Sequence, residues 1–214
     1  MAADLDFFFD PICPWAWITS RWVVNVTEQR PYEINWRFIS LWMLNEENTR
    51  EWYTPEYRAG HFVGHQGLRI ADALRRDAGD VDAVARWYTA VGTALHVEQQ
   101  RTLSRTDTQT WYRTLLARAG FDERFLDAAE DPSHDDHIRA DTELALSRAG
   151  NDVGTPILTF HPGAASEASF FGPVISKAPR GIEAVELWDA VEKLATMSGM
   201  AELKRSNRLA PDFT

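Results

Sequence analysis

Residues 5–16 read Leu5-Asp6-Phe7-Phe8-Phe9-Asp10-Pro11-Ile12-Cys13-Pro14-Trp15-Ala16 and contain the only cysteine of this 214-residue chain. The apolar run 5–9 predicts a buried strand that ends at Asp10-Pro11. Residues 13–29 predict a helix, with Pro14 just inside its start, where the missing N–H of proline costs nothing. Cys13 therefore lies at a helix N-terminus, where free N–H groups and the helix dipole stabilise an anion.

A thiol in such a place can have a lowered pKa and act as a thiolate nucleophile. The alternative is a buried structural cysteine, which is the commoner role of a lone thiol. The junction of strand and helix, with proline next to the thiol, favours the reactive role for Cys13.

The rest of the chain alternates between strand and helix patterns. Alternating apolar residues over 34–40 predict a second strand, which completes a strand–helix–strand unit. Residues 156–160 and 169–171 predict two further strands, and 182–194 predict a closing amphipathic helix. The expected fold is α/β, a thioredoxin fold with a large all-helical insertion. Its parts are residues 1–48 (first half of the thioredoxin fold), 49–150 (helical insertion), 151–198 (second half) and 199–214 (polar tail).

Composition excludes several classes of protein. The chain carries 22 Lys and Arg against 32 Asp and Glu, a formal charge of −10, and 44% of its residues are apolar. An acidic balance argues against nucleic acid as the partner. A single cysteine excludes intrachain disulfides and cysteine-rich zinc sites. We expect a cytoplasmic protein, because residues 1–10 lack the basic start of a signal peptide and no apolar run is long enough for a membrane span.

Thr155-Pro156 is the second informative element. Proline at the start of a strand needs no ladder hydrogen bond, so an ordinary trans bond is the default expectation. In a thioredoxin-type fold, however, a cis-proline loop faces the cysteine and leaves the backbone before it available to an incoming thiol or peptide. We therefore predict a cis bond between Thr155 and Pro156.

Several motifs together resemble one family. The chain resembles the DsbA-like thioredoxin superfamily and, within it, the actinobacterial mycothiol-dependent nitroreductases and disulfide reductases. The resemblance covers nearly the whole chain and rests on residues 8–15, 17–22, 40–46, 55–58, 152–156, 170–177, 179–181 and 202–205.

The resemblance implies a role for individual residues. Cys13 is the expected nucleophile. The thiol and the substrate are expected to contact Pro14, Trp15, Asn45, Tyr57, His96, Thr155 and Pro156. Of these, Asn45, Tyr57 and His96 are expected to line a groove between the thioredoxin part and the helical part. For His96, an ordinary helix histidine and a residue that tunes the thiolate are equally open.

Ala16 departs from the family pattern. The family motif is Cys-Pro-Trp-Cys, and its second cysteine resolves the mixed disulfide formed on the first. Alanine cannot do this, so a thiol from outside the chain must resolve Cys13. Two explanations stay open: an engineered substitution, and a natural enzyme with a single thiol.

The resemblance implies a thiol–disulfide oxidoreductase that uses mycothiol as reductant, with nitroaromatic reduction as a side activity. The expected partners are a low-molecular-weight thiol, a disulfide or electrophilic small molecule, and a mycoredoxin-type reducing protein; a monomer and a homodimer are both open. Neither a metal nor a tightly bound nucleotide is expected. Two alternatives remain: a kappa-type glutathione or mycothiol S-transferase or isomerase, and a binding protein with an unreactive thiol.

Two histidine pairs are candidate metal ligands by spacing. His61 and His65 lie four residues apart, but no neighbouring residue completes a ligand set, so we expect both on the surface. His134 and His137 flank two aspartates, which an acidic first helical turn explains better than a metal site. Gly60, Gly64 and Gly67 form no dinucleotide or phosphate motif.

Overall fold

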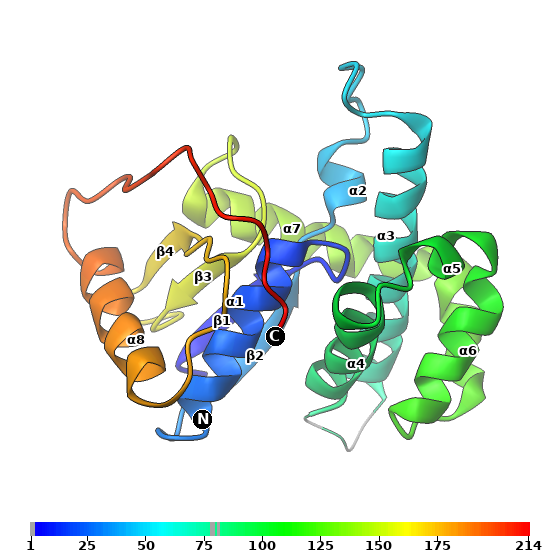
Figure 1. Cartoon of the computed structure of the whole chain (residues 1–214), viewed down its shortest axis with the longest axis horizontal. Coiled ribbons are helices and arrows are strands. Elements are labelled where there is room, and N and C mark those ends of the chain that lie inside the picture. Colours follow the sequence, from blue (N-terminus) through cyan, green and yellow to red (C-terminus); the bar gives the residue numbers. More distant parts are fainter. Residues whose placement is uncertain (1–2, 78–79, 81) are drawn as a thin grey trace. The chain divides into compact units, whose positions relative to one another are not determined.

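The computed structural model describes residues 3–77, 80 and 82–214 (Figure 1). The chain separates into two compact units, which we call the sheet unit and the helical unit. The sheet unit comprises Met1–Phe9, Pro14–Arg37 and Leu144–Thr214, and the helical unit comprises Asp10–Cys13 and Phe38–Glu143.

The sheet unit is built on four strands in the order β2-β1-β3-β4. They are β1 (Leu5–Phe9), β2 (Ile34–Phe38), β3 (Ile157–Phe160) and β4 (Ala168–Phe171). β3 pairs antiparallel with both neighbours, with Leu5 opposite Phe160 and Ile157 opposite Phe171. All five residues of β1 are buried, Asp6 included, as expected for a mainly apolar strand covered on both faces.

Two helices cover one face of this sheet, α1 (Pro14–Thr27) and α8 (Gly181–Ala195), as Figure 1 shows. Trp22 of α1 and Trp188 of α8 pack with ring centroids 5.5 Å apart, and Trp22 Nε1 donates to the Ala184 carbonyl at 2.8 Å. Phe160 of β3 packs on Trp188 at 5.3 Å. Burial of these large aromatic surfaces joins the two helices to the sheet.

Asp6 of β1 points to the opposite face, where its carboxylate meets Arg148 at 2.7 Å and Arg37 at 3.2 Å. Arg148 lies in the last turn of α7 (Asp135–Ala149). The alternation of side chains along β1 thus places Asp6 on the face of the sheet where Arg148 of α7 lies.

The helical unit is organised around its longest helix, α3 (Pro55–Arg76). The remaining elements are α2 (Leu41–Leu44), α4 (Ala83–Gly92), the π-helical turn η1 (Thr93–Val97), α5 (Arg101–Thr106), α6 (Thr108–Arg118), the 3₁₀ segments η2 (Glu123–Glu130) and η3 (Pro132–His134), and the first part of α7. Thr54 caps α3 by accepting from Tyr57 N at 3.2 Å. Trp87 of α4 donates to the Gly67 carbonyl of α3 at 2.8 Å.

Most predicted elements are present, and the α/β thioredoxin-type fold with helical insertion is confirmed. One strand boundary was wrong: β2 ends at Phe38, and Ser40 instead caps α2, where its hydroxyl accepts from Met43 N at 3.3 Å. Within the helical insertion, residues 83–97 form α4 followed by the π-helical turn η1 rather than one continuous α-helix. The predicted cis bond of Thr155-Pro156 is confirmed, and Gly172-Pro173 is a second cis bond that was not predicted.

Candidate functional site

The residues before the thiol form a tight turn in the helical unit. Cys13 N donates to the Asp10 carbonyl at 3.1 Å, and the Asp10 side chain accepts from Ile12 N at 3.0 Å and from Leu41 N at 2.8 Å. Asp10 is fully buried. Burial raises the pKa of its carboxyl to about 7, although the two backbone hydrogen bonds act in the opposite direction. The Asp10 carboxyl therefore fixes the turn to the start of α2.

Helix α3 approaches this turn closely because two of its residues are glycines. A Cβ at Gly64 would lie 2.6 Å from Asp10 Oδ1 and 3.1 Å from the Ile12 side chain. A Cβ at Gly67 would lie 3.0 Å from the Tyr112 hydroxyl and 3.5 Å from Pro11. The two glycines, which matched no ligand motif, thus make room for the turn that precedes Cys13.

His96 lies in η1 and is completely buried. Its Nε2 is 2.9 Å from the Pro11 carbonyl, and its Nδ1 is 3.1 Å from Nη2 of Arg101. A carbonyl only accepts and a guanidinium only donates, so Nε2 carries the proton and Nδ1 is the acceptor. Burial, with the Arg101 charge, lowers the pKa of His96 to about 3, against the opposing hydrogen bond to Pro11. His96 is therefore neutral at physiological pH.

Arg101, the first residue of α5, lies between His96 and the turn that precedes the thiol. Its Nη2 is 3.5 Å from the Ile12 carbonyl, at the limit of a hydrogen bond. Burial lowers the Arg101 pKa, while the negative charges that Cys13 and Tyr57 can carry raise it. Cys13 is buried, with 6% of its surface exposed. Arg101 was not predicted as a site residue, because no sequence motif links it to a thiol so far away in the chain.

Tyr57 and Asn45 are the other predicted site residues in the helical unit. Tyr57 is 54% exposed and contacts the rings of Trp52 and His61, at 5.9 and 5.2 Å. The Asn45 side chain is engaged in its own loop, where Nδ2 donates to the Leu41 carbonyl at 2.8 Å. His96 is hydrogen-bonded to Arg101, and negative charges on Tyr57 and Cys13 raise the Arg101 pKa.

The remaining predicted residues belong to the sheet unit. Pro14, Trp15 and Ala16 form the first turn of α1, and Ala16 is fully buried. The Arg208 guanidinium lies 5.9 Å from the centroid of the half-buried Trp15 ring. Thr155 precedes β3, and its hydroxyl donates to the Phe8 carbonyl at 3.2 Å. The contacts predicted for these residues with a thiol remain predictions.

The expectation that His61 and His65 lie on the surface was wrong, because α3 is the central helix of its unit. His65 is fully buried between Ser40 Oγ at 3.1 Å and Asp135 Oδ1 at 2.9 Å. His61 is 3.3 Å from the Tyr53 hydroxyl. Burial lowers the pKa of both histidines to about 4.

The second histidine pair lies on an aspartate. His134 and His137 each place Nδ1 near Asp72 Oδ2, at 2.8 and 3.1 Å. In the part of the chain that the structure describes, no group of three or more His, Cys, Asp or Glu residues could hold a metal ion. No described helix combines the length and the apolar character that crossing a membrane requires.

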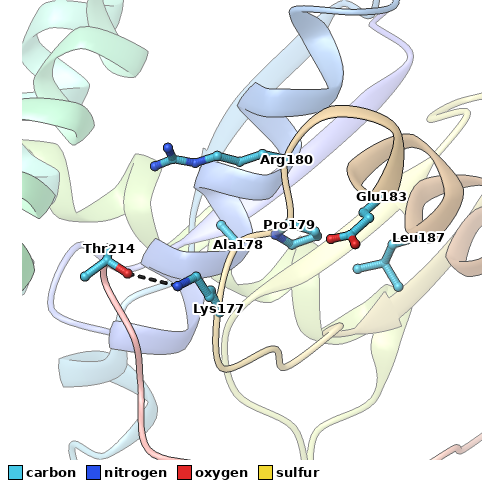
Figure 2. Close-up of a pocket in the computed structure, with 7 residues that line it drawn as sticks. All are labelled: Lys177, Ala178, Pro179, Arg180, Glu183, Leu187 and Thr214. Atoms are coloured by element: carbon cyan, nitrogen blue, oxygen red, sulfur yellow. Dashed lines mark hydrogen bonds between the residues drawn. The ribbon is translucent and has the colours of Figure 1, made fainter.

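A hollow of about 670 Å³ lies elsewhere in the sheet unit, beside the start of α8 (Figure 2). It is lined by Lys177, Ala178, Pro179, Arg180, Glu183, Leu187 and Thr214. Lys177 Nζ donates to Asp212 at 2.9 Å and to the Thr214 hydroxyl at 3.0 Å. This hollow contains none of the residues predicted for the thiol site.

Comparison with solved structures shows the DsbA-like fold. The chain resembles a single-residue variant of Pseudomonas aeruginosa DsbA with a TM-score of 0.52 and 15% identity, over 90% of this chain and 88% of that one. It resembles reduced DsbL with a TM-score of 0.51 and 14% identity, over 91% of each chain.

Two comparisons by sequence identify the family. The chain is 34% identical over 203 residues to the uncharacterized protein Rv2286c of Mycobacterium tuberculosis (strain ATCC 25618 / H37Rv), over 94% of this chain and 81% of that protein. The family model described as Rv2466c-like, mycothiol-dependent nitroreductase Rv2466c, matches residues 12–205, which include Cys13, His96, Arg101 and Pro156. A chain with the DsbA-like fold and one cysteine before its first helix thus belongs to the Rv2466c-like family of mycothiol-dependent nitroreductases, an oxidoreductase family.

Proposed function

We propose that the protein is a mycothiol-dependent thiol–disulfide oxidoreductase whose nucleophile is Cys13. The observation that carries this proposal is the position of the chain's only thiol. Cys13 closes a fixed turn and immediately precedes helix α1, and a negative charge on Cys13 raises the pKa of Arg101. Helix starts and nearby cations both favour a thiolate, which is the reactive form of cysteine. The family description supplies mycothiol as the thiol.

The chemistry takes place in two exchanges. The Cys13 thiolate attacks one sulfur of a disulfide, so that a Cys13 mixed disulfide forms and the other sulfur leaves as a thiolate. An external thiolate then attacks the mixed disulfide, which releases Cys13 as a thiolate and forms a new disulfide. Because position 16 is alanine, the resolving sulfur comes from outside the chain. Tyr57 and Trp52 expose aromatic surface in the unit that contains Cys13, and such surface suits a small organic ligand.

The first test is intact-protein mass spectrometry after incubation with mycothiol disulfide. We expect one added mycothiol per chain, removed by excess mycothiol, and no adduct on Cys13→Ser. Serine differs from cysteine in a single atom, so this variant is the matched control. An unmodified wild-type protein would contradict the proposal. Conjugation of mycothiol to an electrophile, with no adduct on Cys13, would instead identify a kappa-type transferase.

The family description adds nitroaromatic reduction. Each two-electron reduction of a nitro group consumes two thiols and yields one disulfide. We therefore expect loss of nitroaromatic absorbance together with mycothiol oxidation, and loss of both in Cys13→Ser. An unchanged nitroaromatic absorbance and no mycothiol oxidation, in a protein whose Cys13 still forms the adduct with mycothiol disulfide, would restrict the activity to disulfide exchange.

A further inference from the structure

Arg101 is a half-buried cation whose neighbours include no carboxylate. Among residues 3–77, 80 and 82–214, none places a carboxylate oxygen within 4.0 Å of its guanidinium. The anions that interact with it are those that Cys13 and Tyr57 can form, and Arg105 is a neighbouring cation. A buried charge without a counterion is costly, so such a cation usually faces an anion that its function supplies.

His96 holds this cation in place. The buried ring receives a hydrogen bond from Arg101 Nη2 on one nitrogen and donates to the Pro11 carbonyl on the other. Arg101 Nη2 also lies 3.5 Å from the Ile12 carbonyl, one residue before the thiol. A neutral ring is needed here, because a protonated Nδ1 could not accept from a guanidinium.

We propose that the Arg101 guanidinium is the cation that stabilises the Cys13 thiolate, and that neutral His96 is the residue that positions it. The proposal deepens the function proposed above and rests on it for the catalytic consequence. Arg101 keeps its proton throughout, while the Cys13 thiol releases a proton to solvent when it ionises. His96, predicted to line a groove, acts here through Arg101 instead.

The consequence concerns both exchanges at Cys13. A stabilised thiolate is present in a larger fraction at neutral pH, which favours attack on a disulfide. The same stabilisation makes Cys13 a better leaving group when an external thiol attacks the mixed disulfide. Arg101 thus supports the step that a second cysteine performs in the family's Cys-Pro-Trp-Cys motif.

The test titrates the thiol itself, with no disulfide present. Thiolate absorbance is followed against pH, with Cys13→Ser as the blank for other titrating groups such as Tyr57 and Asp10. We expect Arg101→Gln to raise the midpoint of the Cys13 thiolate titration by about one pH unit. Arg105→Gln removes the same charge from the same helix, where Arg105 pairs with Glu56 at 2.9 Å, and is expected to leave the midpoint within a few tenths of a unit.

The role of His96 has its own pair of variants. The oxygen of asparagine can replace the Nδ1 acceptor that faces Arg101, whereas glutamine places its polar group nearer the position of Nε2. We expect His96→Gln to move the midpoint upwards and His96→Asn to restore most of the wild-type value. A merely structural histidine would give equal midpoints in the two variants. Circular dichroism identifies any variant that fails to fold, and Arg101→Lys, which keeps the charge, then replaces Arg101→Gln with an intermediate midpoint expected.

An unchanged midpoint in a folded Arg101→Gln protein, or equal shifts in Arg101→Gln and Arg105→Gln, would overturn the proposal. The two proposals fail separately. If the midpoint moves but mycothiol disulfide leaves no adduct, Arg101 stabilises the thiolate and the proposed function is wrong. If the adduct forms and the midpoint stays, the function stands and Arg101 has no such role.

Discussion

At the scale of single residues, the chemistry depends on Cys13 and on the alanine three positions later. Ala16 is fully buried in the first turn of α1. Because this residue is alanine, the chain has no thiol at the position where the family motif has its second cysteine. The proposed function therefore requires an external thiol for each turnover. Residue 16 is also a small buried position, where replacement by cysteine adds one atom.

We expect Ala16→Cys to create the Cys-x-x-Cys spacing and allow an intramolecular disulfide, which releases a thiol bound to Cys13. Mass spectrometry of the oxidised variant would show the loss of two hydrogens and a shorter-lived mycothiol adduct. Ala16→Ser is the control of equal size and is expected to retain the adduct as the wild type does. A persistent adduct on Ala16→Cys would contradict the expectation.

At the scale of elements, α3 is shaped by the turn that it supports. Gly60, Gly64 and Gly67 lie in one helix, although glycine is a weak helix former. Gly64 is required because the Asp10 carboxyl occupies the space of a side chain. That carboxyl cannot move easily, since two backbone N–H groups hold it. At Gly60, no atom of the described residues lies within 4 Å of the position that a Cβ would occupy, so nothing there requires glycine.

These two glycines give opposite predictions. Gly60→Ala is expected to raise the free energy of unfolding by about 0.5–1 kcal/mol, because alanine is the better helix former. Gly64→Ala is expected to lower it by about 1–3 kcal/mol, because the new methyl group meets Asp10 and Ile12. Urea denaturation of both variants measures the difference. Equal stabilities would mean that the turn adjusts to α3 without cost.

The π-helical turn η1 is the second element that matters to the site. Thr93 and Ala94 accept hydrogen bonds from Glu98 N and Gln100 N, both at 2.9 Å, in place of the usual α-helical pairs. Such wide turns occur frequently at functional sites. Here the turn carries His96 immediately before α5, which begins at Arg101. His96 of η1 and Arg101 of α5 thereby come within hydrogen-bond distance, although they are not three or four residues apart as neighbours on an α-helix are.

At the scale of the whole molecule, three buried histidines lower the free energy of unfolding as the pH falls. Burial lowers the pKa of His61 and His65 to about 4 and that of His96 to about 3, against an ordinary value of 6.5. Below pH 6.5 the unfolded chain therefore binds protons that the folded chain does not, and stability is lost as the pH falls. Asp10 acts in the opposite direction, because its pKa rises from 3.8 to about 7 and the folded state keeps a proton that the unfolded state loses.

The three histidines change the difference in bound protons between the unfolded and folded chains by more than Asp10 does. The free energy of unfolding is therefore expected to rise from about pH 4 to about pH 6.5. The four groups together give a slope of about 2.5 kcal/mol per pH unit near pH 5. Urea titrations at several pH values would measure this slope. His61→Gln removes one of the histidines and is expected to reduce the slope by about half. A flat profile would mean that these histidines are not buried as neutral groups.

The sequence alone determined the strand β1, the helix after Cys13, the helical insertion, the cis bond at Pro156 and the family. The strand, the helix and the insertion depend on local patterns, an apolar run and helical spacing. The cis bond was expected from the thioredoxin-type fold, and the family from contiguous motifs. Only the tertiary structure decided that His61 and His65 are buried, that Gly64 makes room for Asp10, and that His96 is hydrogen-bonded to Arg101. The physical reason is that burial, hydrogen bonding and charge depend on which segments meet in space, and Arg101 and Cys13 are 88 positions apart in the chain.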